Sequence, residues 1–174
     1  MYFEMFPKGK YDIKGDGNKK LVTDLFRRVK IRAKIKDEAS LISEYVVPPG
    51  ETPELTAMKH FGNTELHWVI LLTNDVQDRY YDWPLSYQDF ENYLKDKYTL
   101  PEGIHHFEKV QSSGPQSSID QSHLIEVTSD TVGAVSVSNR EYEQRLQDKK
   151  ARIKLISPTY LPILLEEFER LVSV

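Results

Sequence analysis

Two adjacent histidines and a nearby glutamate give this sequence its best chance of metal chemistry. His105, His106 and Glu108 offer imidazole nitrogens and a carboxylate, which are ligands that zinc accepts. Their spacing does not fit a helical site, because the His-Glu-x-x-His pattern is absent, and adjacent residues on a strand point to opposite faces. We therefore predict a histidine pair on a surface or an interface, and no metal site.

Three aspartates form a second candidate cluster, in this case for calcium. Asp75, Asp78 and Asp82 lie close together but lack the closing glutamate of the EF-hand loop, so they are better interpreted as turn-forming residues. Nucleophilic catalysis has no support either, since the sequence has no cysteine and no Gly-x-Ser-x-Gly motif. The sequence predicts a protein that is not an enzyme and that needs no cofactor.

The charge of the chain is unevenly distributed. The net charge of −4 argues against a dedicated nucleic-acid binder, and mean hydropathy is −0.54, which predicts a modest core. Residues 8–36, however, contain eleven lysines and arginines against three aspartates, a local excess of +8. Such polarity favours docking to a complementary neighbour, although a solvated basic strand would give the same pattern.

The start of the chain and its apolar stretches indicate a soluble protein. Residues 1–7 carry no basic leader before a long apolar run, so we expect no signal peptide. No apolar stretch approaches the ~20 residues that span a bilayer.

A strict alternation of basic and apolar residues over 28–36 predicts a half-buried strand. One face would carry valine, isoleucine and alanine to a core. The other would form a cationic stripe, for which the candidate protein-interface residues are Arg28, Lys30, Arg32 and Lys34. Lysines on a strand also discourage aggregation, so the stripe is open to that simpler interpretation. Nucleic-acid binding is disfavoured, because no aromatic residues are interleaved on this face.

The clearest local pattern covers residues 41–86. A β-prone run at 45–47 is followed by Thr52 as a helix N-cap and by a first helix that Gly62 ends. A second helix runs from residue 64 to Asn74, and residues 83–86 are expected to form a second short strand. The second helix is apolar over so wide an arc that we expect burial on more than one side, by the flanking arm and tail or by a neighbouring subunit.

The remaining chain predicts short elements with a loop between them. An extended arm over residues 2–13 and a glycine-rich turn at 15–18 precede the basic segment. Beyond residue 86 the expected elements are a helix to residue 97, strands at 106–110 and 124–128 around a Ser/Gly-rich mobile loop, a helix at 140–150, a strand at 153–156 and a final helix after Pro158.

The order of elements over residues 45–86 resembles a LysM module. The residues that carry the resemblance are the turn Gly50, Glu51 and Thr52, then the Phe61-Gly62 pair, then Asn74. The resemblance implies an α+β fold with a central LysM-like βααβ module over 41–86. An N-terminal arm and basic strand over 1–40 and a C-terminal strand–helix extension over 87–174 would flank it.

A resemblance to a second family covers more of the chain. The turn at 50–54, the Leu-His-Trp-Val helix ending in Asn-Asp at 65–75, and the Tyr-Tyr-Asp-Trp-Pro run at 80–84 are similar to the baseplate wedge protein 53 family of T-even-type contractile-tailed phages. This resemblance implies a virion protein of the tail baseplate, assembled in the host cytoplasm. Its implied partners are large ring-forming wedge proteins, a sheath-initiator-like subunit and neighbouring wedges, with no nucleic acid, membrane or small-molecule substrate.

Two functions follow from these resemblances. As a structural wedge subunit the chain would tie wedges into a ring around the hub, with Tyr81, Trp83 and Phe168 as candidate interface anchors that could equally be core. The alternative is binding of peptidoglycan or N-acetylglucosamine chains, for which the LysM resemblance implies a groove formed by Gly50, Glu51, Thr52, Asn74 and Asp75. Fold resemblance alone does not decide between them.

Overall fold

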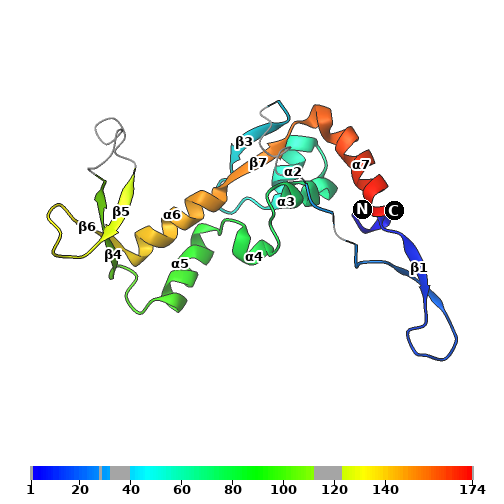
Figure 1. Ribbon diagram of the computed structural model, residues 1–174, viewed down its shortest axis with the longest axis horizontal. Helices are drawn as coiled ribbons and strands as arrows, with labels where there is room; N and C mark the ends of the chain where they lie inside the picture. The colour runs from blue at the N-terminus through cyan, green and yellow to red at the C-terminus, as the bar shows by residue number, and fades with distance from the viewer. Residues whose placement is uncertain (1, 28, 32–39, 112–122, 174) are drawn as a thin grey trace. The chain divides into compact units, whose positions relative to one another are not determined.

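The computed structural model describes residues 2–27, 29–31, 40–111 and 123–173. Helices and strands are mixed along the chain, which confirms the α+β class (Figure 1). Contacts divide the chain into two compact units. Unit 1 comprises Met1–Trp83 together with Ala151–Val174, and unit 2 comprises Pro84–Lys150. No helix among the described residues is long and apolar enough to cross a membrane.

Unit 1 is built on a two-stranded antiparallel sheet whose strands are far apart in the sequence. β3 (Ile42–Val46) pairs with β7 (Arg152–Ile156), with Ile42 opposite Ile156. The ladder continues at both ends, where Val47 N–H donates to Ala151 O and Ser157 N–H donates to Leu41 O, each at 2.8 Å. Residues 151–174 therefore complete the sheet that the first half of the chain begins.

The second strand expected at 83–86 is absent, and that prediction was wrong. Residues 83–86, all of them described, form no strand, and the place beside β3 is taken by β7. Pro84 has no N–H for a ladder, and the Trp83 indole Nε1 donates to Glu51 O at 2.8 Å, which turns the side chain into the core. The compact βααβ module over 41–86 is thus not confirmed.

The first helix of unit 1 begins and ends where the local chemistry predicted. In α2 (Pro53–Phe61) the Thr52 side chain accepts Leu55 N–H at 3.3 Å, and Gly62 ends the helix with φ 72°. A 3₁₀ turn, η2 (Thr64–Leu66), then leads into α3 (His67–Thr73). The predicted bounds of the first helix are thus confirmed, whereas the second predicted helix begins as a 3₁₀ turn and becomes α-helical only at His67.

The wide apolar arc of α3 is buried on two sides, as expected. On one side Trp68 and Val69 pack with Phe6 and with residues of α7 (Leu161–Ser173), and the Trp68 and Phe168 ring centroids are 4.6 Å apart. The arm contributes η1 (Tyr2–Met5) to this cluster. On the other side Ile70 packs in a second cluster with members of the loops, α2 and β7: Val47, Ala57, Trp83, Ile153 and Leu155. The arm and the tail, which come from opposite ends of the sequence, therefore bury the Trp68 side of α3.

The N-terminal region also contains a β-hairpin that the sequence pattern did not predict. β1 (Lys8–Tyr11) pairs antiparallel with β2 (Lys20–Thr23), and no other strand in the described part of the chain joins this sheet. The glycine-rich turn was predicted correctly, because Gly15 and Gly17 both take positive φ in the connection between the strands.

Unit 2 combines a three-stranded sheet with two helices. The sheet order is β5 (Leu124–Val127), β4 (Ile104–Val110), β6 (Val135–Ser138), and all neighbours are antiparallel. The helices are α5 (Tyr87–Lys97) and α6 (Asn139–Ala151). The predicted helices and strands here are confirmed, except that β6 was not foreseen. Most of the Ser/Gly-rich loop predicted at 111–121 lies outside the described residues.

A buried carboxylate is central to unit 2. Glu143 on α6 is 2% exposed and accepts hydrogen bonds from Lys97 Nζ at 2.7 Å, Tyr98 Oη at 2.8 Å and Tyr93 Oη at 3.2 Å. Burial would raise the pKa of this carboxyl, but its polar partners more than offset that effect, so the pKa lies below its ordinary value.

Replacing this carboxylate should make the stability of unit 2 less dependent on pH. The folded-state pKa of Glu143 is lowered, so its stabilisation is complete above the unfolded-state pKa of about 4.3 and is lost as the pH falls through the folded-state value. We expect Glu143→Gln to lower the free energy of unfolding by about 1–3 kcal/mol at neutral pH. Urea titrations followed by amide NMR signals of β4 and α6 would measure this loss.

The comparison is sharpened by acid and by a matched variant. In acid, where Glu143 is protonated in both states, the same substitution should cost little. Glu126 is exposed, so Glu126→Gln provides the control and should change the free energy of unfolding little at either pH. A loss for Glu143→Gln that is equally large in acid would show that the ionised form is not what stabilises unit 2.

Candidate functional site

The turn at residues 50–52 is held in unit 1 by hydrogen bonds to the side chain of Glu51. Glu51 is 7% exposed and accepts from Tyr45 Oη at 2.9 Å and from Thr56 Oγ1 at 2.8 Å, and it also pairs with Lys59. Burial would raise the pKa of this carboxyl, but these three contacts outweigh it and the pKa lies below its usual range. The carboxylate is therefore held ionised in a fixed position, joining β3 to α2.

Asn74 joins the end of α3 to strand β7. Its amide Nδ2 donates to Ile70 O at 2.9 Å and to Lys154 O at 2.8 Å, and its Oδ1 accepts Lys154 N–H at 2.8 Å. The side chain thus makes the two hydrogen bonds to Lys154 that the backbone of a neighbouring strand would otherwise make. This contact explains why an asparagine ends the second helix of the motif.

Asn74→Ala should destabilise unit 1 by about 1–3 kcal/mol, because it leaves the N–H and C=O of Lys154 without their side-chain partner. Urea unfolding followed by tryptophan fluorescence would measure the loss, since both tryptophans of the chain lie in unit 1. Gln77→Ala, in the exposed loop that follows, should change the free energy by less than about 0.5 kcal/mol. Equal effects of the two substitutions would contradict the role given to Asn74.

Asp75 has a backbone role at the same helix end. It takes the left-handed conformation with φ 55°, Asp75 N–H donates to Leu72 O at 3.4 Å, and Val76 N–H donates to Leu71 O at 2.9 Å. This is the Schellman pattern that satisfies the last carbonyls of a helix. Its carboxylate also lies 3.8 Å from Lys30.

The proposed glycan groove gains no support from these contacts. Glu51 and Asn74 use their polar side-chain atoms on their own chain, and Thr52 caps α2. An ion pair between Arg79 and Glu54, 2.9 Å long, joins the segment after Asp75 to α2. The motif residues that suggested sugar binding hold unit 1 together.

The predicted interface residues fall into three groups. Arg28, Arg32 and Lys34, with most of the strand expected at 28–36, lie outside the described residues. Lys30 and Tyr81 are on the surface, with the Tyr81 side chain 72% exposed. Trp83 and Phe168 are 4% and 3% exposed inside unit 1, which leaves them little surface to offer a partner.

The histidine pair does not behave as expected for a regular strand. The Nδ1 atoms of His105 and His106 are 2.9 Å apart, and the His105 ring stacks on Tyr142 with centroids 3.9 Å apart. The prediction that the two rings point to opposite faces was wrong, because the β4–β6 register is irregular at this position. Among the described residues no group of three or more histidines and carboxylates could hold a metal ion.

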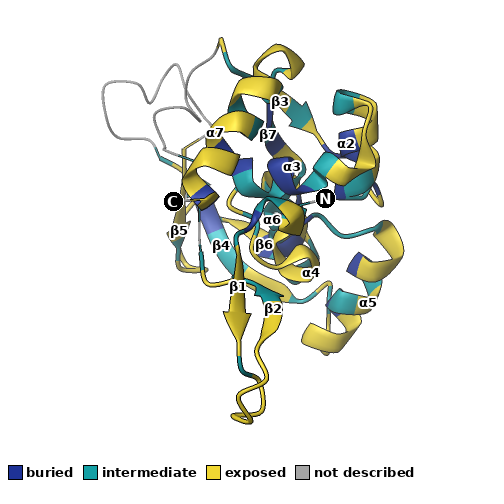
Figure 2. Cartoon of the chain, turned by 90° about the vertical axis from the view of Figure 1, so that its right-hand side faces the viewer, coloured by how far each residue is buried: buried dark blue, intermediate teal, exposed yellow. Residues whose placement is uncertain are grey.

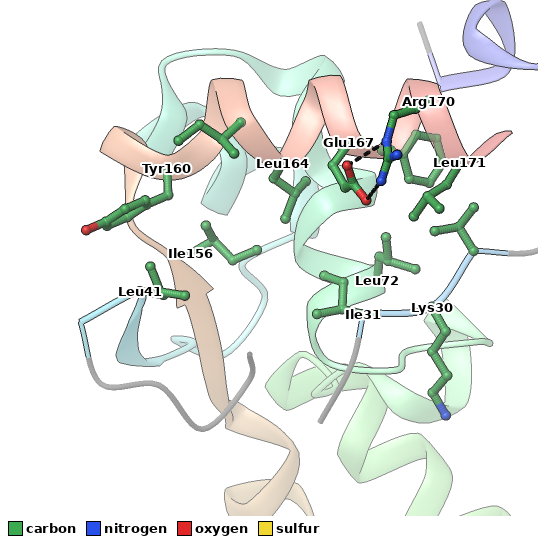
Figure 3. A pocket seen from close by; sticks show the side chains of 13 residues that line it. Lys30, Ile31, Leu41, Leu72, Ile156, Tyr160, Leu164, Glu167, Arg170 and Leu171 are labelled. Atoms are coloured by element: carbon green, nitrogen blue, oxygen red, sulfur yellow. Dashed lines mark hydrogen bonds and ion pairs between the residues drawn. The ribbon is translucent and has the colours of Figure 1, made fainter. Parts of the chain in front are cut away.

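Two surface features of unit 1 were not foreseen. The first is an apolar groove of about 590 Å³ beside α7, into which Ile156, Leu164 and Leu72 point, with the Glu167–Arg170 pair at its rim (Figure 3). The second is the hairpin β1–β2, whose residues are mostly exposed (Figure 2). A run such as Lys-Gly-Lys-Tyr carries too weak a strand pattern to predict the hairpin.

The comparison with known proteins identifies the class as structural proteins of the phage tail baseplate. The chain is 35% identical over 65 residues to Baseplate wedge protein gp53 of Enterobacteria phage T4, which covers 37% of this chain and 33% of that protein. The match thus spans about a third of the relative's length. Residues 1–114, about two thirds of the chain, match the model of the family Base plate wedge protein 53. The chain belongs to the Base plate wedge protein 53 family, and its place in the virion is the tail baseplate.

Proposed function

We propose that this chain docks to neighbouring wedge proteins and helps tie the wedges of the baseplate into a ring around the tail hub. The observation that carries this proposal is the family match over residues 1–114. The T4 relative supports it, since its name describes a baseplate wedge protein. The partners we propose are the large ring-forming wedge proteins, a small sheath-initiator-like subunit and the adjacent wedge, with assembly in the host cytoplasm.

The surface of unit 1 supports docking to proteins. Exposed aromatic and apolar side chains are the usual anchors of such interfaces. Tyr80 and Tyr81 are 81% and 72% exposed, and on α2 Leu55 and Met58 are 51% and 52% exposed. The groove beside α7 adds a concave apolar surface.

A scaffold role without catalysis also agrees with how the polar residues are used. The clustered polar residues of the motif loops bond to their own chain, where they fix helix ends and strand β7. Buried carboxylates such as Glu108 are paired, in this case with Arg145 through two bonds of 2.8 Å. Rigid elements held in this way suit a subunit that must keep its shape between partners.

Co-expression with the other wedge proteins of the same phage tests this function. The full chain should co-purify with the wedge through size exclusion, and omitting it should leave wedges that do not join into rings. A chain that stays monomeric while the other subunits assemble complete rings would overturn the proposal.

A further inference from the structure

The hairpin of residues 8–23, here called the basic hairpin, is largely exposed to solvent. Among the residues that the structure describes, its sheet has two strands, so each strand keeps one edge on which no described strand pairs. All four residues of β1 are exposed, and so are Lys20 and Leu21 of β2 (Figure 2). A two-stranded hairpin in water is marginally stable unless something packs against it.

The connection between the two strands is nevertheless well fixed. The Asp12 carboxylate accepts the backbone N–H groups of Lys14 at 3.2 Å, Gly15 at 2.7 Å, Asp16 at 3.3 Å and Gly17 at 2.7 Å. The bond from Gly17 contributes most to lowering the pKa of Asp12. The turn is thus organised before any partner arrives, which reduces the entropy cost of docking.

The basic hairpin carries an excess of positive charge. It carries five exposed lysines against two aspartates: Lys8, Lys10, Lys14, Lys19 and Lys20. In the described part of the chain no ion pair joins any of these lysines to a carboxylate. A partner that covers the hairpin must therefore bring negative charge.

Lysines alone could serve only to keep a strand edge from aggregating. That explanation does not account for the large apolar side chains between them, because Tyr11, Ile13 and Leu21 are 63%, 62% and 65% exposed. A purely protective edge would leave such residues out. Alternating cationic and apolar residues on an open strand are instead suited to pairing with another protein.

We propose that the basic hairpin docks by strand addition onto an acidic sheet edge of a different baseplate protein. This inference rests on the proposed function and names the chemistry of one partner. Pairing with a second copy is disfavoured, since it would bring lysine-bearing strands against each other, and like charges on facing strands are destabilising. Nucleic acid is disfavoured by the net charge of −4.

Charge reversal in the full-length chain tests the inference. Lys10→Glu/Lys20→Glu should weaken binding to the co-expressed wedge proteins by at least about tenfold and reduce the dependence of binding on salt. The matched control is Lys95→Glu/Lys149→Glu, which makes the same charge change at exposed positions of unit 2 and should bind within about twofold of wild type. Tryptophan fluorescence would verify that unit 1 remains folded in both variants.

A photo-crosslinking residue in place of Leu21 identifies the partner. Crosslinks to an acidic strand of another wedge protein would support the inference, whereas crosslinks to a second copy, to nucleic acid or to nothing would overturn it. Wild-type binding with an unaffected hairpin variant would refute this inference and leave the proposed function intact. Failure of the wild-type chain to join the wedge would refute the proposed function itself.

Discussion

A chain that ends at Lys150 is expected to lose the fold of unit 1. The deletion removes β7 and α7, and with them five buried apolar side chains: Ile153, Leu155, Ile156, Phe168 and Val172. Each such side chain contributes about 1.5–3 kcal/mol by burial, and their sum is comparable with the 5–15 kcal/mol that stabilises a typical domain. The emission of the two tryptophans, both in unit 1, should shift to that of exposed indole.

Single substitutions on β7 give the matched comparison. Leu155→Asp, at a position that is 2% exposed, should have nearly the effect of the deletion, whereas Arg152→Asp on the exposed side of the strand should leave the emission native. A native spectrum from the truncated chain would contradict the pairing of β3 with β7. The family match ends at residue 114, so loss of the native emission on truncation would also show that the matched segment depends on residues beyond it.

Phe168→Ala is expected to destabilise unit 1 by about 3–5 kcal/mol, the usual cost of a large cavity in an aromatic cluster. Phe168 is 3% exposed, and its ring centroid lies 4.6 Å from that of Trp68 and 5.5 Å from that of Tyr2. The cavity would therefore loosen the contact between the tail, the arm and α3 together. Urea unfolding followed by tryptophan fluorescence measures the change directly, because Trp68 borders the cavity.

The same helix offers the control. Ile163 is 63% exposed on α7, so Ile163→Ala should change the free energy of unfolding by no more than about 0.5 kcal/mol. A similar small effect for Phe168→Ala would mean that α7 does not pack on α3 as described.

Features that depend on neighbouring residues were predictable from the sequence. Thr52 and Gly62 predict the ends of α2, because both are typical capping residues, and the glycines at 15 and 17 predict a turn. The wide apolar arc of α3 correctly predicted cover on two sides. Each of these inferences rests on contacts that span only a few residues.

Features that depend on distant pairing were not predictable. Pro84 argues locally against a strand at 83–86, but nothing local indicates that β3 pairs with residues 152–156 instead, because that segment lies far along the chain. Asn74 could be assigned to a helix end, but its bonds to Lys154 appear only once the chain has folded back. The buried role of Glu143 is hidden for the same reason, since charged residues on a helix ordinarily face water.

The candidate site changed most between sequence and structure. The turn at 50–52 together with Asn74 and Asp75 resembles a sugar-binding motif, yet in the fold these residues hold unit 1 together. The described surfaces that we propose for partners include the basic hairpin, the exposed tyrosines 80 and 81, the exposed apolar residues of α2 and the groove beside α7. Membership of the wedge protein 53 family gives these surfaces their context.

Cryo-electron microscopy of virions of the phage that encodes this chain tests the central claim most directly. We predict density for unit 1 in the baseplate, with contacts to subunits of two adjacent wedges, and peptides of the chain in mass spectra of the purified tails. Complete baseplates that contain no copy of the chain would contradict the account.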